Sequence, residues 1–334
     1  MTLYFGSYTR RLSKGIYSAD FNEESGLLSN LQLLATEDNP TYLAFSQAGN
    51  LYTVGSENGQ GGVAAFDAHF QPLNHVVTDG APLCYVSVDE DRQLVYGANY
   101  HKGQIFSYKI ESDGSLRLAD TVQHHGSGPH ENQQSAHAHF ADLTPDHYLV
   151  TCDLGIDSVI TYDVSDEGTL TEIGHYKSAP GAGPRHIVFH PTAKLAYLIC
   201  ELNASIEVLI YDGVGQFELL QTISTLPADY TGPNNTAAIR ISKDGKFVYA
   251  SNRGHDSIAI YRTLGDATLE LIDIQSSLGQ IPRDFALVSN DSYLIVAHQD
   301  SDKVTVFKRH PETGLLTEIP QDFEAPEAVC ILEN

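Results

Sequence analysis

Two histidines, His137 and His139, stand two residues apart in the stretch ENQQSAHAHFADLTPD, residues 131–146. Alternate residues of a strand point to the same face, so both rings could reach one metal ion or one substrate. Catalytic zinc usually takes three protein ligands, and Asp153 or Glu201 could supply the third. A histidine, with an ordinary pKa of ~6.5, can also act as a general acid or base near neutral pH. Both interpretations stay open at this point, and we expect a site without metal or cofactor.

Three further histidines precede this pair, namely His124, His125 and His130. They lie among Gly, Ser, Pro, Asn and Gln residues, which is the composition of a loop. We expect them in a solvated loop between two strands, and we expect His190 and His255 to be structural or on the surface.

Arginine occurs at three conspicuous places, in the stretches GPRH, SNRG and IPRD, which hold Arg185, Arg253 and Arg283. Basic residues are scarce in this chain, with 19 Lys and Arg against 43 Asp and Glu. The planar guanidinium binds carboxylate or phosphate through two hydrogen bonds at once. These arginines are therefore candidates for binding an anion.

The elements that must position these residues come from an internal repeat. The stretches AHAHFADLTPDHYLVTCDLGIDSVITYDV and NTAAIRISKDGKFVYASNRGHDSIAIYR share one pattern: an apolar run, a polar turn, a second apolar run, a kink and a third run. A fourth short run after a Gly-containing turn closes each unit, as in SDGSLRLADTV. About seven such units of about 48 residues each match four-stranded propeller blades.

The chain ends complete the repeat. The stretch APEAVCIL resembles a first strand without a second, and TLYFGSYT resembles a second strand without a first. Their pairing would close the last blade and leave no open sheet edge. The sequence thus predicts an all-β, seven-bladed β-propeller of four-stranded antiparallel blades, closed by the terminal strands, as a single domain over 1–334. The W-D and kelch repeat signatures are absent.

In a propeller, the start of each first strand and the end of each second strand lie at the same rim, since the two strands are antiparallel. Aligning the repeats places these residues at the starts of first strands: Thr41, Tyr85, His139, Arg185 and Ala237, with Arg283 one place earlier in its unit. The ends of second strands hold Ser7, Glu57, Asn99, Asp153, Glu201, Asn252 and His298, with Arg253 following Asn252. The rim is therefore predicted to be ionic.

Composition limits the partners. The formal net charge of −24 argues against nucleic acid and anionic membranes, which need a basic surface. A small anionic substrate remains possible because a local arginine cluster can outweigh a distant acidic surface. No apolar stretch is long enough to span a membrane. We expect no signal peptide, a cytoplasmic location, and a monomer or weak homodimer. The four cysteines, Cys84, Cys152, Cys200 and Cys330, are expected to be buried thiols.

The chain resembles the seven-bladed lactonase family, the bacterial propeller-type 6-phosphogluconolactonases, which also includes fungal carboxy-cis,cis-muconate cyclases. The resemblance rests on FGSYT, AHAHF…TPD, GAGPRHIVFHP…ELN, YASNRGHDSIAIY, IPRDFAL and PEAVCIL, which span essentially the whole chain. It implies a lactonase that hydrolyses a carboxylic ester in the propeller's central cleft. One departure is Arg240 in IRISKDG, where some bacterial members have histidine, so no role is transferred to that position.

The resemblance implies a catalytic set of His139, Arg185, Glu201 and Arg253. His139 is the candidate general acid or base, Glu201 orients it or is itself the base, and the two arginines stabilise the oxyanion or hold the substrate anion. Arg283 is the candidate cation for a phosphate. The further predicted substrate-binding residues are His186, Asn203, Asp153, Asn99 and Tyr85.

The predicted partner is a small anionic sugar-phosphate lactone, 6-phospho-D-glucono-1,5-lactone. Another lactone or a carboxy-muconate is the alternative substrate, since the same residues could protonate a double bond while arginines hold carboxylates. A non-catalytic scaffold is a third possibility, but it predicts an apolar or aromatic rim instead of an ionic one.

Overall fold

The computed structural model describes residues 1–334, and its strands form seven four-stranded antiparallel sheets. Six sheets follow the chain order, and the seventh has the order β28-β1-β2-β3. The predicted seven-bladed propeller of four-stranded blades is confirmed. The only helical element is a 3-10 turn, η1 (Leu154–Ile156), and no helix is long and apolar enough to cross a membrane.

Contacts divide the chain into two compact units. Unit 1 comprises residues 1–34, 186–210 and 218–334, and unit 2 comprises residues 35–185 and 211–217. The predicted single domain over 1–334 stays a prediction.

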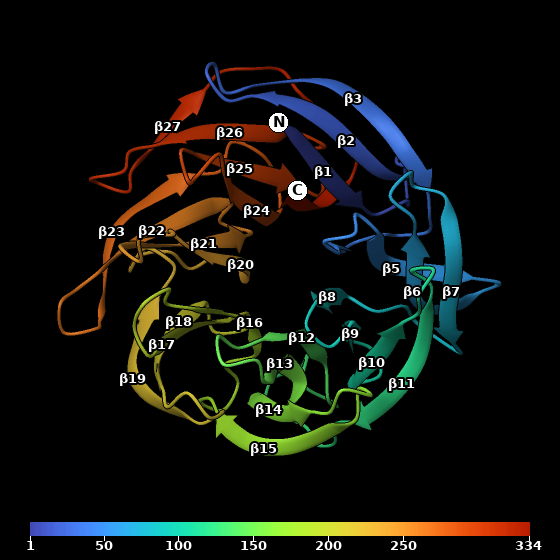
Figure 1. The fold of residues 1–334 in the computed structure, drawn as a ribbon. Helices are drawn as coiled ribbons and strands as arrows, with labels where there is room; N and C mark the ends of the chain where they lie inside the picture. Colours follow the sequence, from blue (N-terminus) through green and yellow to red (C-terminus); the bar gives the residue numbers. More distant parts are fainter. The chain divides into compact units, whose positions relative to one another are not determined.

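Unit 1 contains most of four blades (Figure 1). The blade that joins the chain ends consists of β28 (Ala328–Glu333), β1 (Thr2–Ser7), β2 (Gly15–Asn22) and β3 (Leu27–Thr36). The next consists of β16 (Pro184–Phe189), β17 (Leu195–Cys200), β18 (Ser205–Tyr211) and β19 (Phe217–Ser224). Then follow β20 (Asn235–Ile241), β21 (Phe247–Arg253), β22 (Ser257–Thr263) and β23 (Leu269–Ser276). The last consists of β24 (Pro282–Val288), β25 (Tyr293–His298), β26 (Val304–Arg309) and β27 (Leu316–Ile319).

Unit 2 contains three blades. They are β4 (Leu43–Phe45), β5 (Leu51–Glu57), β6 (Gln60–Phe66) and β7 (Pro72–Thr78); β8 (Tyr85–Asp89), β9 (Leu94–Asn99), β10 (Gln104–Ile110) and β11 (Leu116–Gln123); and β12 (Ala138–Leu143), β13 (Leu149–Asp153), β14 (Ser158–Val164) and β15 (Leu170–Lys177).

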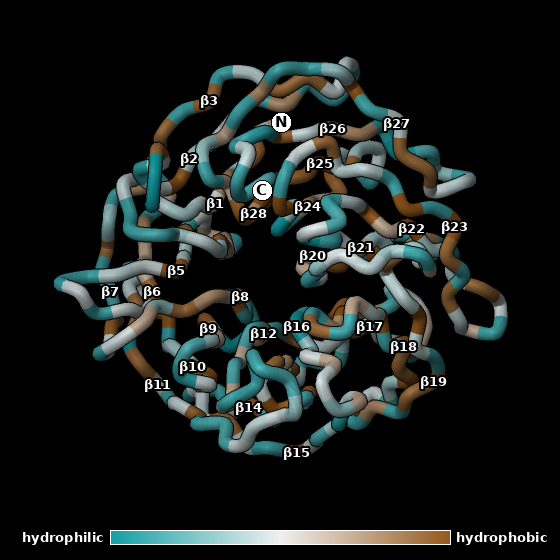
Figure 2. The backbone as a smooth tube through the Cα atoms, turned by 180° about the vertical axis from the view of Figure 1, so that it is seen from behind, coloured by the Kyte–Doolittle hydropathy of each residue, from teal (hydrophilic) through white to brown (hydrophobic).

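Burial follows the position of a strand in its blade. Second strands such as β9 and β17 are buried throughout, because both of their faces are covered. Fourth strands such as β15 and β19 contain buried or half-buried residues separated by one to three exposed ones. Figure 2 shows hydrophobic and hydrophilic residues following one another along these outer strands.

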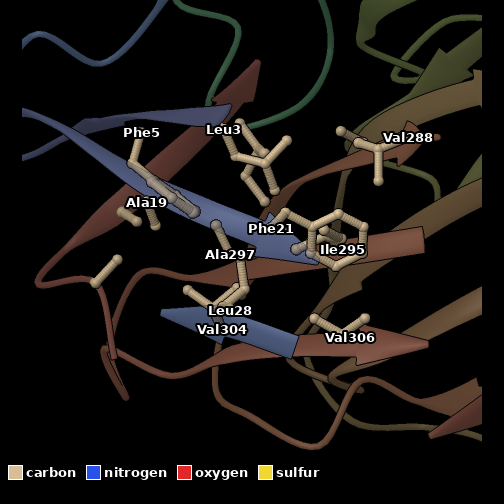
Figure 3. Packing of buried hydrophobic residues seen from close by; sticks show 14 of the residues in the cluster. Leu3, Phe5, Ala19, Phe21, Leu28, Val288, Ile295, Ala297, Val304 and Val306 are labelled. Atoms are coloured by element: carbon tan, nitrogen blue, oxygen red, sulfur yellow. The ribbon is translucent and has the colours of Figure 1, made fainter. Parts of the chain in front are cut away.

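The predicted closure by the terminal strands is confirmed. β1 pairs antiparallel with β28, with Phe5 opposite Ile331. Apolar side chains of this blade, including Phe5 and Phe21, pack against Ile295 and Val306 of the β24–β27 blade (Figure 3). These side chains are almost completely buried, so the hydrophobic effect holds the two blades together.

Buried tyrosines of the second strands connect neighbouring blades, in a chain that has no tryptophan. The hydroxyl of Tyr52 donates to Gly114 O at 3.0 Å, and that of Tyr249 donates to Gly314 O at 2.8 Å. In the same way Tyr293 donates to Glu23 O at 2.8 Å. In each case the acceptor lies in the hairpin between the third and fourth strands of the next blade. The same tyrosine position in these repeats therefore supplies a hydrogen bond between neighbouring blades.

Glu327, just before β28, fastens the loop that follows β1. Its carboxylate accepts hydrogen bonds from four successive backbone N–H groups, those of Arg10 (3.1 Å), Arg11 (2.8 Å), Leu12 (2.8 Å) and Ser13 (3.0 Å). Burial opposes ionisation of this group, but the four hydrogen bonds outweigh it and lower the pKa of Glu327 below its ordinary value of 4.5. The C-terminal segment therefore fixes residues 10–13.

We expect Glu327→Gln to lower the free energy of unfolding by about 2 kcal/mol at neutral pH, because four charge-assisted bonds lose their ionised acceptor. Because the pKa is lower in the folded state, this stabilisation is present above the ordinary pKa of the carboxyl and is lost as pH falls through the folded value. Urea unfolding of the wild type and the variant should therefore converge in acid. The exposed Glu324→Gln is the control, and equal stability of Glu327→Gln and wild type at neutral pH would refute the argument.

Candidate active site

Glu201 and Arg253 form an ion pair in unit 1, with Arg253 Nη2 2.9 Å from Glu201 Oε2. Glu201 directly follows β17, and Arg253 is the last residue of β21. The start of β20 joins the two ends: Thr236 N–H donates to Glu201 O (3.3 Å), its hydroxyl donates to Cys200 O (3.0 Å), and Asn235 pairs with Arg253. The local strand pairing thus brings carboxylate and guanidinium together.

The pair is largely removed from solvent, with side-chain exposures of 12% for Arg253 and 15% for Glu201. Arg253 Nη2 also donates to Thr236 O at 2.9 Å, while its Nε is buried without a hydrogen-bond partner. Burial lowers the pKa of Arg253, and the positive charge of Arg283 lowers it further, against the opposing effect of Glu201. The guanidinium remains charged at neutral pH because its ordinary pKa is so high.

Arg283 and His139 occupy equivalent places in their blades. Pro282 pairs with His298 and Ala138 pairs with Asp153, and the next paired residues are Asp284 and Phe140. Arg283 and His139 are therefore the extra residues of β-bulges at the starts of β24 and β12. The expectation that Arg283 stands one place early is corrected: the extra residue of its repeat lies in the β24–β25 turn, where Ser289, Asn290 and Asp291 all have positive φ. Bulges often re-aim a side chain beside a functional site.

His139 lies in unit 2 with 5% of its surface exposed, and its ring is edge-on to Tyr100 at 5.9 Å. His137 stacks on the same Tyr100 ring at 4.4 Å, and its Nδ1 hydrogen-bonds to Tyr100 O at 2.8 Å. The backbone carbonyl therefore occupies one ring nitrogen of His137. No group of three or more His, Cys, Asp or Glu side chains is arranged to hold a metal ion.

The expectation of a solvated His124 is wrong. This residue is 5% exposed, and its ring bridges Asp153 Oδ2 (Nδ1, 2.8 Å) and the Tyr162 hydroxyl (Nε2, 2.8 Å). Burial raises the pKa of Tyr162, so its hydroxyl stays protonated and can donate to Nε2, while Nδ1–H donates to Asp153. His125 is exposed as expected. The rim partner Asp153 stabilises the buried His124, a pairing that repeat alignment does not indicate.

Asp153 is fully buried, and its Oδ1 accepts from the backbone N–H groups of His137 (2.7 Å) and Gly155 (3.0 Å). With Oδ2 on His124, both oxygens have protein partners, so Asp153 supports the chain just before His139. Asn99 is similarly occupied: it accepts from Lys102 N–H at 3.0 Å and donates to Ala81 O at 2.9 Å. Their predicted contacts with substrate stay predictions, and these bonds favour a positioning role.

The remaining predicted site residues differ in their surroundings. Tyr85 starts β8, donates to Asp142 at 3.0 Å and packs on Tyr42 and Phe140. Asn203 is exposed in a turn, and the Ser205 hydroxyl lies 2.7 Å from its Oδ1. Two residues of β16, Arg185 and His186, are buried with 2% and 3% exposure.

Arg240, at the position that departs from the family pattern, is bound within the protein. Its Nη2 lies 2.7 Å from Oδ1 of the buried Asp284, and its Nη1 donates to Ile239 O at 2.9 Å. A structural ion pair therefore accounts for the arginine at this position.

The structure thus brings Glu201, Arg253 and Arg283 together in unit 1, and it places His139, Asp153, Asn99 and Tyr85 in unit 2. Sequence reasoning missed Tyr100 in unit 2, whose ring contacts those of both His137 and His139. Tyr100 follows the end of β9 in an irregular segment, where repeat alignment gives no register.

The chain matches the family model "Lactonase, 7-bladed beta-propeller" over residues 2–333. It belongs to this family of lactonases. A 6-phosphogluconolactonase of Bacillus subtilis is 40% identical to it over 338 residues, covering 98% of this chain and 97% of the relative. A crystal structure from Lactobacillus plantarum has 44% identity, a TM-score of 0.97 and 99% coverage of both chains. A periplasmic gluconolactonase of Pseudomonas aeruginosa has 28% identity and a TM-score of 0.91, covering 99% of this chain and 98% of that one.

The protein is accordingly a hydrolase that acts on a lactone, a cyclic ester. This lactonase needs to activate water, stabilise an oxyanion and protonate the departing ring oxygen. In unit 1 it holds one carboxylate and one guanidinium at 2.9 Å, which suits the first two tasks.

Proposed function

We propose that this lactonase hydrolyses 6-phospho-D-glucono-1,5-lactone to 6-phosphogluconate, a step of the pentose phosphate pathway. The single observation that carries the proposal is the largely buried Glu201–Arg253 ion pair, together with a second cation, Arg283, whose charge lowers the pKa of Arg253. The phosphate-specific name of the Bacillus subtilis relative supports the choice of substrate. The proposal includes a cytoplasmic location, where sugar phosphates are made, and a monomer or weak homodimer.

In the proposed mechanism, the Glu201 carboxylate accepts a proton from water as its oxygen bonds to the lactone carbonyl carbon. Arg253 stabilises the negative charge that develops on the carbonyl oxygen. As the carbonyl re-forms, the bond from that carbon to the ring oxygen breaks, and the departing oxygen takes up a proton. His139 is proposed as the acid for this last step.

A substrate panel tests the proposal. With spontaneous hydrolysis subtracted, kcat/KM should be highest for 6-phosphogluconolactone, lower for unphosphorylated gluconolactone, and undetectable for cyclisation of a carboxy-muconate. A rate on the phosphorylated lactone no higher than the spontaneous rate would refute the proposal. Equal values for both sugar lactones would instead favour a general gluconolactonase.

That second candidate has a specific observation in its favour. The Pseudomonas aeruginosa structure with a TM-score of 0.91 is of a gluconolactonase, whose named substrate carries no phosphate. A requirement for the phosphate group is therefore the observation that separates the two functions.

A further inference from the structure

Tyr8, in the FGSYT stretch just after β1, has two guanidinium groups against its ring. The Arg10 Cζ lies 3.9 Å from the ring centroid and the Arg283 Cζ lies 5.5 Å from it. Both distances are within the range of cation–π attraction. The guanidinium groups of Arg10 and Arg283, which are far apart in the sequence, therefore both lie against the Tyr8 ring.

Neither of these guanidinium groups has an ion pair or a hydrogen bond within the protein. This is unusual in a chain of net charge −24, where most arginines contact a carboxylate. Arg11, the neighbour of Arg10, pairs with Asp302 at 2.8 Å, and Arg253 pairs with Glu201. Like charges repel, and no carboxylate lies within salt-bridge distance of either guanidinium group to offset this repulsion, so an anion bound beside Tyr8 would stabilise both.

These two positive charges adjoin the catalytic pair. The positive charge of Arg283 lowers the pKa of Arg253, which places Arg283 near the Glu201–Arg253 pair, and the Tyr8 ring lies 5.5 Å from the Arg283 guanidinium. The loop that carries Arg10 is fixed by the four hydrogen bonds to Glu327, and Tyr8 N–H donates to Glu327 O at 3.0 Å. The Arg10 backbone is thus held in place, while its side chain remains exposed and able to turn toward a ligand.

We infer that Tyr8, Arg10 and Arg283 form the phosphate subsite of this lactonase, an inference that rests on the proposed function. A phosphate monoester carries nearly two negative charges at neutral pH, which two guanidinium groups without carboxylate partners would neutralise. Each fork can donate two parallel hydrogen bonds to phosphate oxygens. Tyr8 positions both arginines through its ring, and Arg253 remains available for the carbonyl end of the substrate.

Binding of the product measures this subsite without turnover. We would titrate 6-phosphogluconate, gluconate and inorganic phosphate into the full-length protein by calorimetry. The wild type is expected to prefer 6-phosphogluconate to gluconate. Arg283→Met and Arg10→Met should each lower that preference about 10- to 100-fold, the effect of losing charge-assisted hydrogen bonds. Each should also weaken binding of inorganic phosphate.

Matched variants separate this effect from a change of net charge. Arg11→Gln removes a charge from the same loop, and Arg262→Gln removes one that faces Glu270 at 3.6 Å, so both should keep the wild-type preference. Tyr8→Phe keeps the ring and should keep the preference, while Tyr8→Leu should lower it. Arg283→Lys retains a charge at the site and tests the role of Arg283 if Arg283→Met fails to fold.

Unchanged preference in folded Arg283→Met and Arg10→Met would overturn the inference, as would an equal loss of affinity for gluconate. The proposed function can fail separately. If the wild type does not accelerate hydrolysis of 6-phosphogluconolactone but binds phosphate through Arg10 and Arg283, the subsite stands and the substrate is another phosphorylated compound. If hydrolysis is fast and neither arginine affects the preference, the function stands and the subsite is refuted.

Discussion

Glu201→Gln is expected to lower kcat for lactone hydrolysis about 100-fold or more, with a much smaller change in KM. Glutamine has nearly the same shape and can still accept a hydrogen bond from Arg253, so the pair's packing at 2.9 Å is largely retained. Glutamine cannot accept a proton from water, however. The loss therefore falls on the chemical step, and steady-state kinetics with the spontaneous rate subtracted would measure it.

The control for this variant is Glu218→Gln, which removes a carboxylate from an exposed position on the outer strand β19. It should leave kcat and KM unchanged. Thermal unfolding should show that Glu201→Gln is folded, since glutamine retains the packing of glutamate. This measurement is needed because the loss of activity of an unfolded variant would say nothing about catalysis. If folded Glu201→Gln kept kcat within about threefold of wild type, Glu201 would not be the base.

The second large effect is expected from His139→Ala, which should lower kcat about 100-fold or more by removing the proposed acid. His139 is the bulge residue of β12 and is 5% exposed, so its side chain is held in a defined environment. His139→Gln, which preserves more of the packing against Tyr100, should be comparably slow.

His137 provides the matched control. One of its ring nitrogens already contacts Tyr100 O and its ring stacks on the Tyr100 ring, so His137→Ala should affect kcat much less than His139→Ala. Equal losses in the two variants, together with inhibition by a chelator that added zinc reverses, would support a metal held by the H-x-H pair instead.

The repeat in the sequence was sufficient to predict the seven blades and their closure, because strand periodicity and hairpin turns are local properties that recur in every unit. The same alignment placed Glu201 and Arg253 at neighbouring strand ends, where the structure has an ion pair. It did not predict that Arg283 and His139 are equivalent bulge residues, because one extra residue in the β24–β25 turn shifts the count along that repeat by one place.

The network around His124 could not be predicted for a different physical reason. His124 follows β11 in a stretch of polar composition, and only the tertiary fold brings it to Asp153 and Tyr162. The same holds for Arg10, whose loop is ordered by a carboxylate 317 residues away in the sequence, that of Glu327. Composition predicts that such segments are loops but not what they contact.

The most direct test of the central claim is the rate at which 6-phosphogluconate appears from freshly made 6-phosphogluconolactone, with wild-type protein, with Glu201→Gln and with no protein. We predict a wild-type rate proportional to protein concentration and well above the spontaneous rate, and a Glu201→Gln rate close to the spontaneous one. A folded wild type that does not exceed the spontaneous rate would contradict the proposed function. A Glu201→Gln variant as fast as wild type would contradict the assignment of that function to the Glu201–Arg253 pair.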